Sequence, residues 1–187
     1  MSEREKLCIA WFFAFEGIIS GSFSGSADLF KERNQWGEES FGWIIFACVG
    51  AGIAAVPIVA KLCDAHGSKN LTLVSAGGLL VSTPFMAKFT ATDGVMSYLC
   101  LVAFVLIFGV LMAALDICVN AQACLYEKLT GESHMGFMHA LYAVGAVVGS
   151  LLAGLLIRLG YSFFQILCII VAFCGVGSPC FLKIIPK

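Results

Sequence analysis

Six apolar segments, each about as long as a membrane is thick, account for most of the 187 residues. The segments are residues 7–27, 41–60, 71–89, 96–125, 135–157 and 161–182. About 20 predominantly apolar residues in a helix cross the hydrocarbon core of a bilayer. Helices also satisfy their backbone hydrogen bonds internally, which lipid requires. The sequence therefore predicts an all-α membrane protein, with six transmembrane helices forming one domain over residues 1–187.

The composition supports a membrane environment. Hydrophobic residues make up 60% of the chain and charged residues 12%, against about 25% charged residues in a typical soluble domain. The polar breaks between the segments are too short for an extramembrane domain, so lipid is the expected surrounding. The net charge is −1 and no basic run occurs, so a nucleic-acid partner is not expected.

Cysteine and histidine give no sign of a metal or a cofactor. No two of the nine cysteines fall within four residues of each other, and most lie in apolar segments, as buried free thiols do. The three histidines are dispersed and lack the spacing of metal ligands. For His139, near the start of the fifth segment, we expect a hydrogen bond to Glu127 or to a backbone carbonyl.

Two acidic residues, Glu16 and Asp116, lie at mid-membrane depth, on the first and fourth segments. A carboxylate in hydrocarbon costs at least about 2.5 kcal/mol, so it normally faces a bundle interior or a watery path. Glu16 follows Lys6 by ten residues and Asp116 precedes Glu127 by eleven, which places both about 15 Å from the same membrane surface. The first and fourth helices are therefore predicted to line a substrate or proton path.

Polar and small residues recur at helical spacing on both of these segments. The first segment carries one polar stripe and one glycine stripe beside it: Glu16, Ser20, Ser24 and Asp28, then Gly17, Gly21 and Gly25. The fourth carries a single stripe: Gly109, Ala113, Asp116, Asn120 and Glu127. Helix packing alone is the favoured interpretation of the glycines. Asp28 can also be interpreted as no more than an interfacial residue at the end of the helix. Packing gives no reason to bury Glu16.

The positions of the two acids fit an inverted repeat. In transporters built this way, segments 1 to 3 and 4 to 6 are equivalent triplets whose first members correspond. The interiors of the other four segments hold no charged residue. We therefore expect two inverted three-helix repeats.

Lysine and arginine favour one orientation. With a cytoplasmic amino terminus, the inner side carries Arg4, Lys6, Lys61, Lys69, Lys128, Lys183 and Lys187, and the outer side carries Lys31, Arg33, Lys88 and Arg158. This asymmetry predicts that both termini are cytoplasmic. A cleaved signal peptide at residues 1–27 is the weaker alternative, because the apolar stretch is too long and Glu16 interrupts it.

The loop at residues 60–69 resembles the signature loop of the major facilitator superfamily, whose pattern is roughly Gly-x-x-x-Asp-Arg-x-Gly-Arg-Lys/Arg. The residues that match are Asp64, Gly67 and Lys69. Ala60 and Ala65 depart from the first glycine and the arginine of that pattern.

The fourth and first segments are similar to the fucose-permease-like branch of that superfamily. The stretch 116–122 has an acid and, four residues later, an asparagine; Glu127, His139-Ala140 and a Gly-x-x-x-Gly pair at 145 and 149 follow. Ser26-Ala27-Asp28 resembles the outer end of the first helix in that branch.

The resemblance implies a symporter that couples proton movement to the uptake of a small solute such as a sugar. It assigns Asp28 and Asp116 as the protonatable pair and Asn120 as a polar cavity residue; Glu16 rests on the burial argument alone. It also implies a cytoplasmic gate formed by Asp64, Gly67 and Lys69. Members of the superfamily have two six-helix halves with substrate between them. The partner is therefore a missing second half or a second chain.

Two other classes of function were weighed. An intramembrane serine protease fits poorly, because Ser22-Phe23-Ser24-Gly25 lacks the leading glycine and no histidine is expected at mid-membrane depth to act as base. No His-Glu-x-x-His motif occurs for a zinc protease, so we do not expect an enzyme. A structural or regulatory six-helix protein without transport is the other alternative, and it would be indifferent to loss of Glu16, Asp28 and Asp116.

Overall fold

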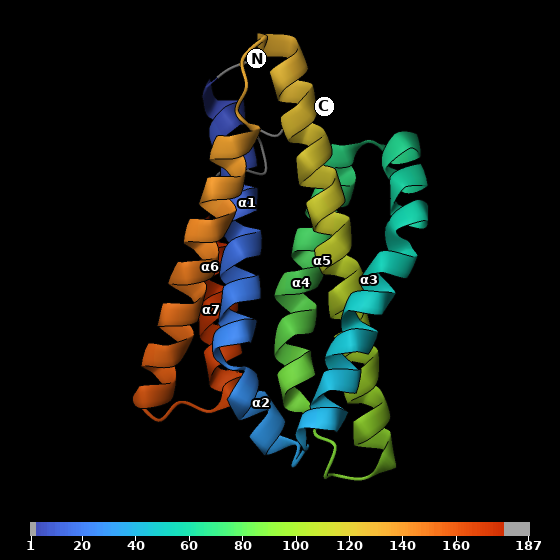
Figure 1. Ribbon diagram of the computed structural model, residues 1–187, viewed down its shortest axis with the longest axis vertical. Coiled ribbons are helices and arrows are strands. Elements are labelled where there is room, and N and C mark those ends of the chain that lie inside the picture. The colour runs from blue at the N-terminus through green and yellow to red at the C-terminus, as the bar shows by residue number, and fades with distance from the viewer. Residues whose placement is uncertain (1–2, 178–187) are drawn as a thin grey trace.

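The computed structural model describes residues 3–177, and the described part of the chain folds into helices without strands (Figure 1). The helices are α1 (Glu3–Gly25), α2 (Ala27–Arg33), α3 (Glu38–His66), α4 (Ser68–Lys88), α5 (Val95–Thr130), α6 (Met135–Arg158) and α7 (Phe163–Gly177). Of these, α1, α3, α4, α5 and α6 are long and apolar enough to cross a membrane, and α7 is a shorter apolar helix. The prediction of an all-α chain with several membrane-spanning helices is confirmed for the described residues. Residues 178–182 of the last predicted segment, with Lys183 and Lys187, lie outside them.

The helices alternate in direction, so the polar connections gather at two opposite ends (Figure 1). The beginning of α1, the α3–α4 connection and the α5–α6 connection share one end. The connections after α2, α4 and α6 share the other. For the described residues, this arrangement agrees with the partition of positive charges made from the sequence.

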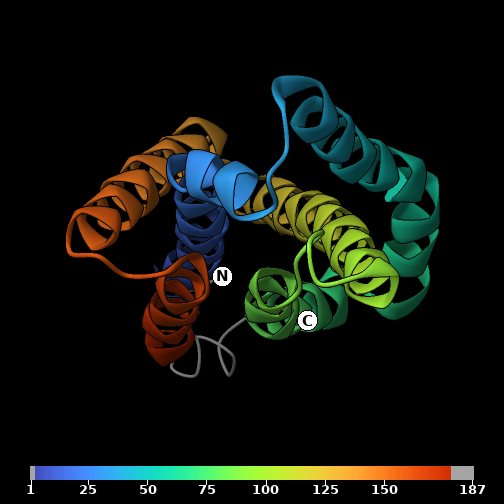
Figure 2. The ribbon, with the colours of Figure 1, turned by 90° about the horizontal axis from the view of Figure 1, so that it is seen from below.

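Two boundaries differ from the predicted segments. The stretch between the predicted segments 41–60 and 71–89 is almost entirely helical, because α3 continues to His66 and α4 begins at Ser68. Gly67 alone separates them, with φ +81°, a left-handed conformation that favours glycine. The first predicted segment is also divided, since α1 ends at Gly25 and α2 turns away toward α3 (Figure 2).

The division of the first segment has a local cause in its serines. The hydroxyl of Ser26 donates a hydrogen bond to the backbone carbonyl of Ser22 at 2.6 Å. The hydroxyl of Ser22 donates one to the backbone carbonyl of Ile19 at 2.9 Å. Such bonds from serine to the preceding turn compete with the backbone ladder and bend helices. The helix therefore changes direction at Ser26, and the stripe predicted to continue to Asp28 is interrupted.

The most extensive helix contact joins α1 to α6, and glycines make it possible. A Cβ added at Gly17 or Gly21 would collide with backbone atoms of α6, and one added at Gly145 or Gly149 would collide with backbone atoms of α1. A second close crossing joins α3 to α5, where a Cβ on Gly52 would lie 2.8 Å from the carbonyl oxygen of Gly109. Helices in lipid associate through van der Waals contact, which small residues allow at short range. The predicted packing role of the α1 glycines is thus met by a partner helix.

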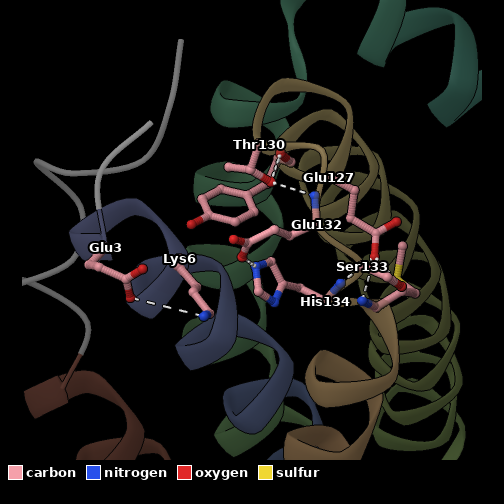
Figure 3. Close-up of polar contacts among 9 residues, drawn as sticks. Glu3, Lys6, Glu127, Thr130, Glu132, Ser133 and His134 are labelled. Carbon is pink, nitrogen blue, oxygen red and sulfur yellow. Dashed lines mark hydrogen bonds and ion pairs between the residues drawn. The ribbon is translucent and has the colours of Figure 1, made fainter.

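The α5–α6 corner is held by one carboxylate (Figure 3). The Oε1 atom of Glu127 accepts hydrogen bonds from the backbone N–H groups of His134 at 2.5 Å and Met135 at 2.7 Å, and from the Ser133 hydroxyl at 3.3 Å. The two backbone N–H groups lie at the start of α6, where N–H groups have no partner within the helix. Glu127 therefore caps α6. Among the described residues His139 forms a hydrogen bond neither to Glu127 nor to a backbone carbonyl, so both alternatives expected for it are wrong.

Candidate substrate cavity

A polar cavity of about 320 Å³ lies between α1, α5 and α6. Its lining comprises Phe13 and Glu16 from α1, Met112, Ala113 and Asp116 from α5, and His139 and Tyr142 from α6. Glu16 and Asp116, for which the sequence predicts a common depth, therefore open onto the same space. Their helices come together because α1 packs against both α5 and α6.

Glu16 is the more deeply placed of the two acids. Its residue surface is 5% exposed, and its Oε2 atom has no hydrogen-bond partner among the described residues. A buried carboxylate without a partner loses its hydration with no compensation, which costs several kcal/mol when it is ionised. A group of this kind is retained where a ligand or a proton completes it.

Asp116 is more open and has an amide neighbour. The Asn120 Nδ2 group donates to Asp116 Oδ1 at 2.7 Å and to the Asp116 carbonyl at 2.8 Å. The spacing of one helical turn on α5 produces this pair. Asn120 does not line either of the two cavities that Asp116 borders. Its contact with the site is through the carboxylate that it orients.

A second, larger cavity of about 630 Å³ lies between α1, α3 and α5. It shares Met112, Ala113 and Asp116 with the polar cavity, and Ser20 and Ser24 of the α1 stripe line it. The rest of the lining is predominantly apolar, with Phe23, Phe41, Ile45, Val49, Ile53, Val56 and Phe108 among its members. Together the two cavities form a continuous surface, polar on the α6 side and apolar on the α3 side, with Asp116 at the junction.

Asp28 lies apart from this surface. It sits in the first turn of α2, its side chain is 94% exposed, and its nearest cation is Lys31 at 4.0 Å. Lys31 is engaged mainly by Glu38 at 2.6 Å, and that hydrogen bond raises the pKa of Lys31. The structure thus brings Glu16 and Asp116 together but leaves Asp28 at the end of the bundle. Its role in a proton path stays a prediction.

The residues of the signature-like loop lie at the end of the molecule that also carries the α5–α6 corner (Figure 1). Asp64 is exposed in the last turn of α3, and Lys69 is half-buried in the first turn of α4. Gly67 forms the joint between them. The exposed position of Asp64 leaves its carboxylate available to another part of the protein.

Two functional candidates on α6 were missed from the sequence. The Tyr142 hydroxyl donates to Ser20 Oγ at 3.3 Å, and the His139 ring lies edge-on to Phe13 with centroids 5.3 Å apart. Both line the polar cavity with Glu16. The available signal was their spacing of three residues on α6, which places them on one helical face, continued by Gly145.

Comparisons with known proteins identify the family. The family model described as Major Facilitator Superfamily matches residues 7–187. An uncharacterised MFS-type transporter of Yersinia pestis is 26% identical over 80% of this chain and 37% of its own length. An uncharacterised transporter of Sinorhizobium fredii is 26% identical over 74% of this chain and 35% of its own. The membrane protein MosC of Rhizobium meliloti is 21% identical over 79% of this chain and 35% of its own length.

The chain spans just over a third of the length of these relatives. No solved structure matches it significantly. The apolar helices and the family model show an integral, multi-pass membrane protein. Members of this family are transporters rather than enzymes. The chain belongs to the major facilitator superfamily of membrane transporters.

Proposed function

We propose that the chain is the amino-terminal half of a proton-coupled transporter for a small solute. The observation that carries the proposal is the buried, unpartnered carboxylate of Glu16, which opens onto the same cavity as Asp116. Neither packing nor helix stability explains an acid in this position. A partner that comes and goes, such as a proton or a solute, does.

The packing supports the proposal that six helices form two inverted triplets. In the first triplet α1 is followed by α3 and α4, and in the second α5 is followed by α6 and α7. The first helix of each triplet packs on the middle helix of the other, as α1 on α6 and α5 on α3. Both crossings are glycine-mediated. Each first helix also carries one of the two cavity acids, as equivalent positions require.

A second six-helix unit is the proposed partner, either in the same polypeptide or in another chain. Large apolar residues are exposed on α3 and α6, such as Ile53 and Leu151, and Ile53 also lines the larger cavity. A second unit packed on these residues would close the cavities around a solute. Asp64, Gly67 and Lys69 are the proposed gate against that unit at the cytoplasmic end. Both termini are proposed to be cytoplasmic.

Coupling follows from the cost of charge in the cavity. Glu16 is buried and Asp116 lines the same cavity, so the two carboxylates repel each other and proton uptake by one of them is favoured. Entry of a solute changes that balance, because it changes what each carboxylate contacts. The titratable groups that face this space are Glu16 on α1, Asp116 on α5, and His139 and Tyr142 on α6. A sugar, the substrate class implied by the resemblance, stays a prediction.

The test uses Asp116→Asn in the full-length protein. The amide keeps the shape of the side chain but cannot exchange a proton near neutral pH, so uphill uptake driven by a pH gradient should be lost. Counterflow exchange, which needs no net proton movement, should survive. Glu39→Gln, the same change at an exposed acid in the first turn of α3, is the control and should retain uptake.

Undiminished uphill uptake by Asp116→Asn would remove Asp116 as the coupling group. The role would then pass to Glu16 or Asp28. Indifference to loss of all three acids would favour the structural or regulatory alternative.

A further inference from the structure

We propose that the solute is an organic cation with an apolar body, whose charged group binds between Glu16 and Asp116. This inference rests on the proposed transport function and names its substrate class. Three observations support it: the charge of the cavity lining, the unsatisfied hydrogen-bond acceptor of Glu16 and the apolar space beside Asp116.

The lining combines two carboxylates with one titratable base, His139. Glu16 and Asp116 are acidic, and neither of the two cavity linings contains a lysine or an arginine among the described residues. Two carboxylates with no fixed cation make the space strongly negative, and low-dielectric walls increase that effect. An anionic solute would be repelled. A cation would supply the missing charge.

Two other polar side chains at the site are already engaged. The Tyr142 hydroxyl donates to Ser20, and the Asn120 amide donates to Asp116. Glu16 is 5% exposed, and among the described residues its Oε2 atom has no hydrogen-bond partner. A donor that is also positively charged, such as an ammonium, would satisfy both the hydrogen-bond and the charge requirement.

The rings around this carboxylate also favour a cation. Phe13 and Tyr142 line the same cavity as Glu16. The faces of aromatic rings attract ammonium groups, and more strongly when the site is desolvated. This attraction does not require a hydrogen-bond donor, so it also serves a quaternary cation.

The larger cavity indicates what the cation is attached to. Its lining carries hydroxyl groups only on Ser20 and Ser24, and the remainder is largely aromatic and aliphatic. A polyhydroxylated solute placed there would leave several of its hydroxyl groups unpaired, each at the cost of its lost hydration. An apolar body would instead bury its surface at a gain. The lining therefore favours an amphipathic cation over the sugar that the resemblance implies.

The test is equilibrium binding to the full-length protein in nanodiscs. The probe is radiolabelled tetraphenylphosphonium, and the matched control ligand is tetraphenylborate, which has the same four-phenyl shape and the opposite charge. Empty nanodiscs give the lipid background. We expect saturable binding of the phosphonium, at least a tenfold rise in its Kd in Glu16→Gln and in Asp116→Asn, and no change in Glu39→Gln. Tetraphenylborate should show no saturable binding.

Glu16→Asp keeps the charge and should retain part of the affinity, which separates loss of charge from loss of fold. Saturable borate binding equal to that of the phosphonium would overturn the inference. So would phosphonium binding that is unaffected by both neutralising variants. Uphill uptake of a neutral sugar without phosphonium binding would overturn the substrate class and leave the proposed transport standing. Phosphonium binding with undiminished pH-driven uptake by Asp116→Asn would instead remove the coupling proposal alone.

Discussion

Gly149 on α6 offers a direct test of the close crossing with α1. A Cβ added at this position would lie 2.9 Å from the backbone nitrogen of Ser22 and 3.0 Å from the carbonyl carbon of Ile18, and closer still to the Ile18 carbonyl oxygen. All three atoms belong to the backbone, so no side chain can rotate away. Gly149→Ala must therefore push the two helices apart.

The size of the effect follows from the distances. Relieving the contact with the backbone nitrogen of Ser22, from 2.9 Å to an ordinary 3.4 Å, already requires about 0.5 Å, and the closer contact with the Ile18 carbonyl oxygen requires more. A gap of about 0.5–1 Å forfeits a quarter to a half of the attraction between each atom pair, which is only ~0.1–0.2 kcal/mol. Summed over a crossing, this gives the ~1–3 kcal/mol typical of overpacking. The higher helix propensity of alanine offsets up to about 1 kcal/mol of this loss in stability.

The same helix supplies a matched control. A Cβ on Gly154 would meet no atom within 4 Å, so Gly154→Ala keeps the propensity gain without the collision. We expect a loss of about 0.5–2 kcal/mol for Gly149→Ala and a neutral or slightly positive change for Gly154→Ala. The measurement is the free energy of unfolding in mixed micelles titrated with SDS and followed by circular dichroism. Equal stability of the two variants would show that the crossing is looser than described.

Three further predictions concern the ends of the bundle. Glu127→Ala removes the cap of α6 and should lower the free energy of unfolding by about 1 kcal/mol in the same titration, whereas Glu132→Ala at an exposed side chain should not. Arg33→Leu removes a guanidinium that donates to the last carbonyls of α4, and should lower the free energy of unfolding by about 1 kcal/mol. An unchanged free energy of unfolding would show that solvent screens this contact. For orientation, an impermeant thiol reagent should label a cysteine placed at Gln35 from outside but not one placed at Ser68, and the reverse pattern would invert the proposed topology.

The sequence predicted the features that depend on distance along one helix. Rise per residue is constant, so the ten residues after Lys6 and the eleven before Glu127 were enough to place Glu16 and Asp116 at one depth. The apolar segments likewise follow from length and composition. The pairing of Asp116 with Asn120 also lies within one helix, at one turn of separation.

Features that depend on direction were not predictable in this way. A four-residue stripe assumes a straight helix, and the serine hydroxyl bonds that divide α1 from α2 turn Asp28 away from the cavity. His139 and Tyr142 reach Glu16 only because α6 crosses α1 at short range. The sequence contains the glycines that permit this crossing but does not say which helix they meet.

The two stripes of α1 are linked through that crossing. Gly17 directly follows Glu16, and the atom that its missing side chain admits is the backbone oxygen of Tyr142. The Tyr142 side chain lines the cavity and its hydroxyl reaches Ser20 on the polar stripe. Close packing on the glycine stripe thus sets how near α6 stands to the acid on the neighbouring stripe. The glycines were interpreted as packing residues, and it is by packing that they shape the cavity around Glu16.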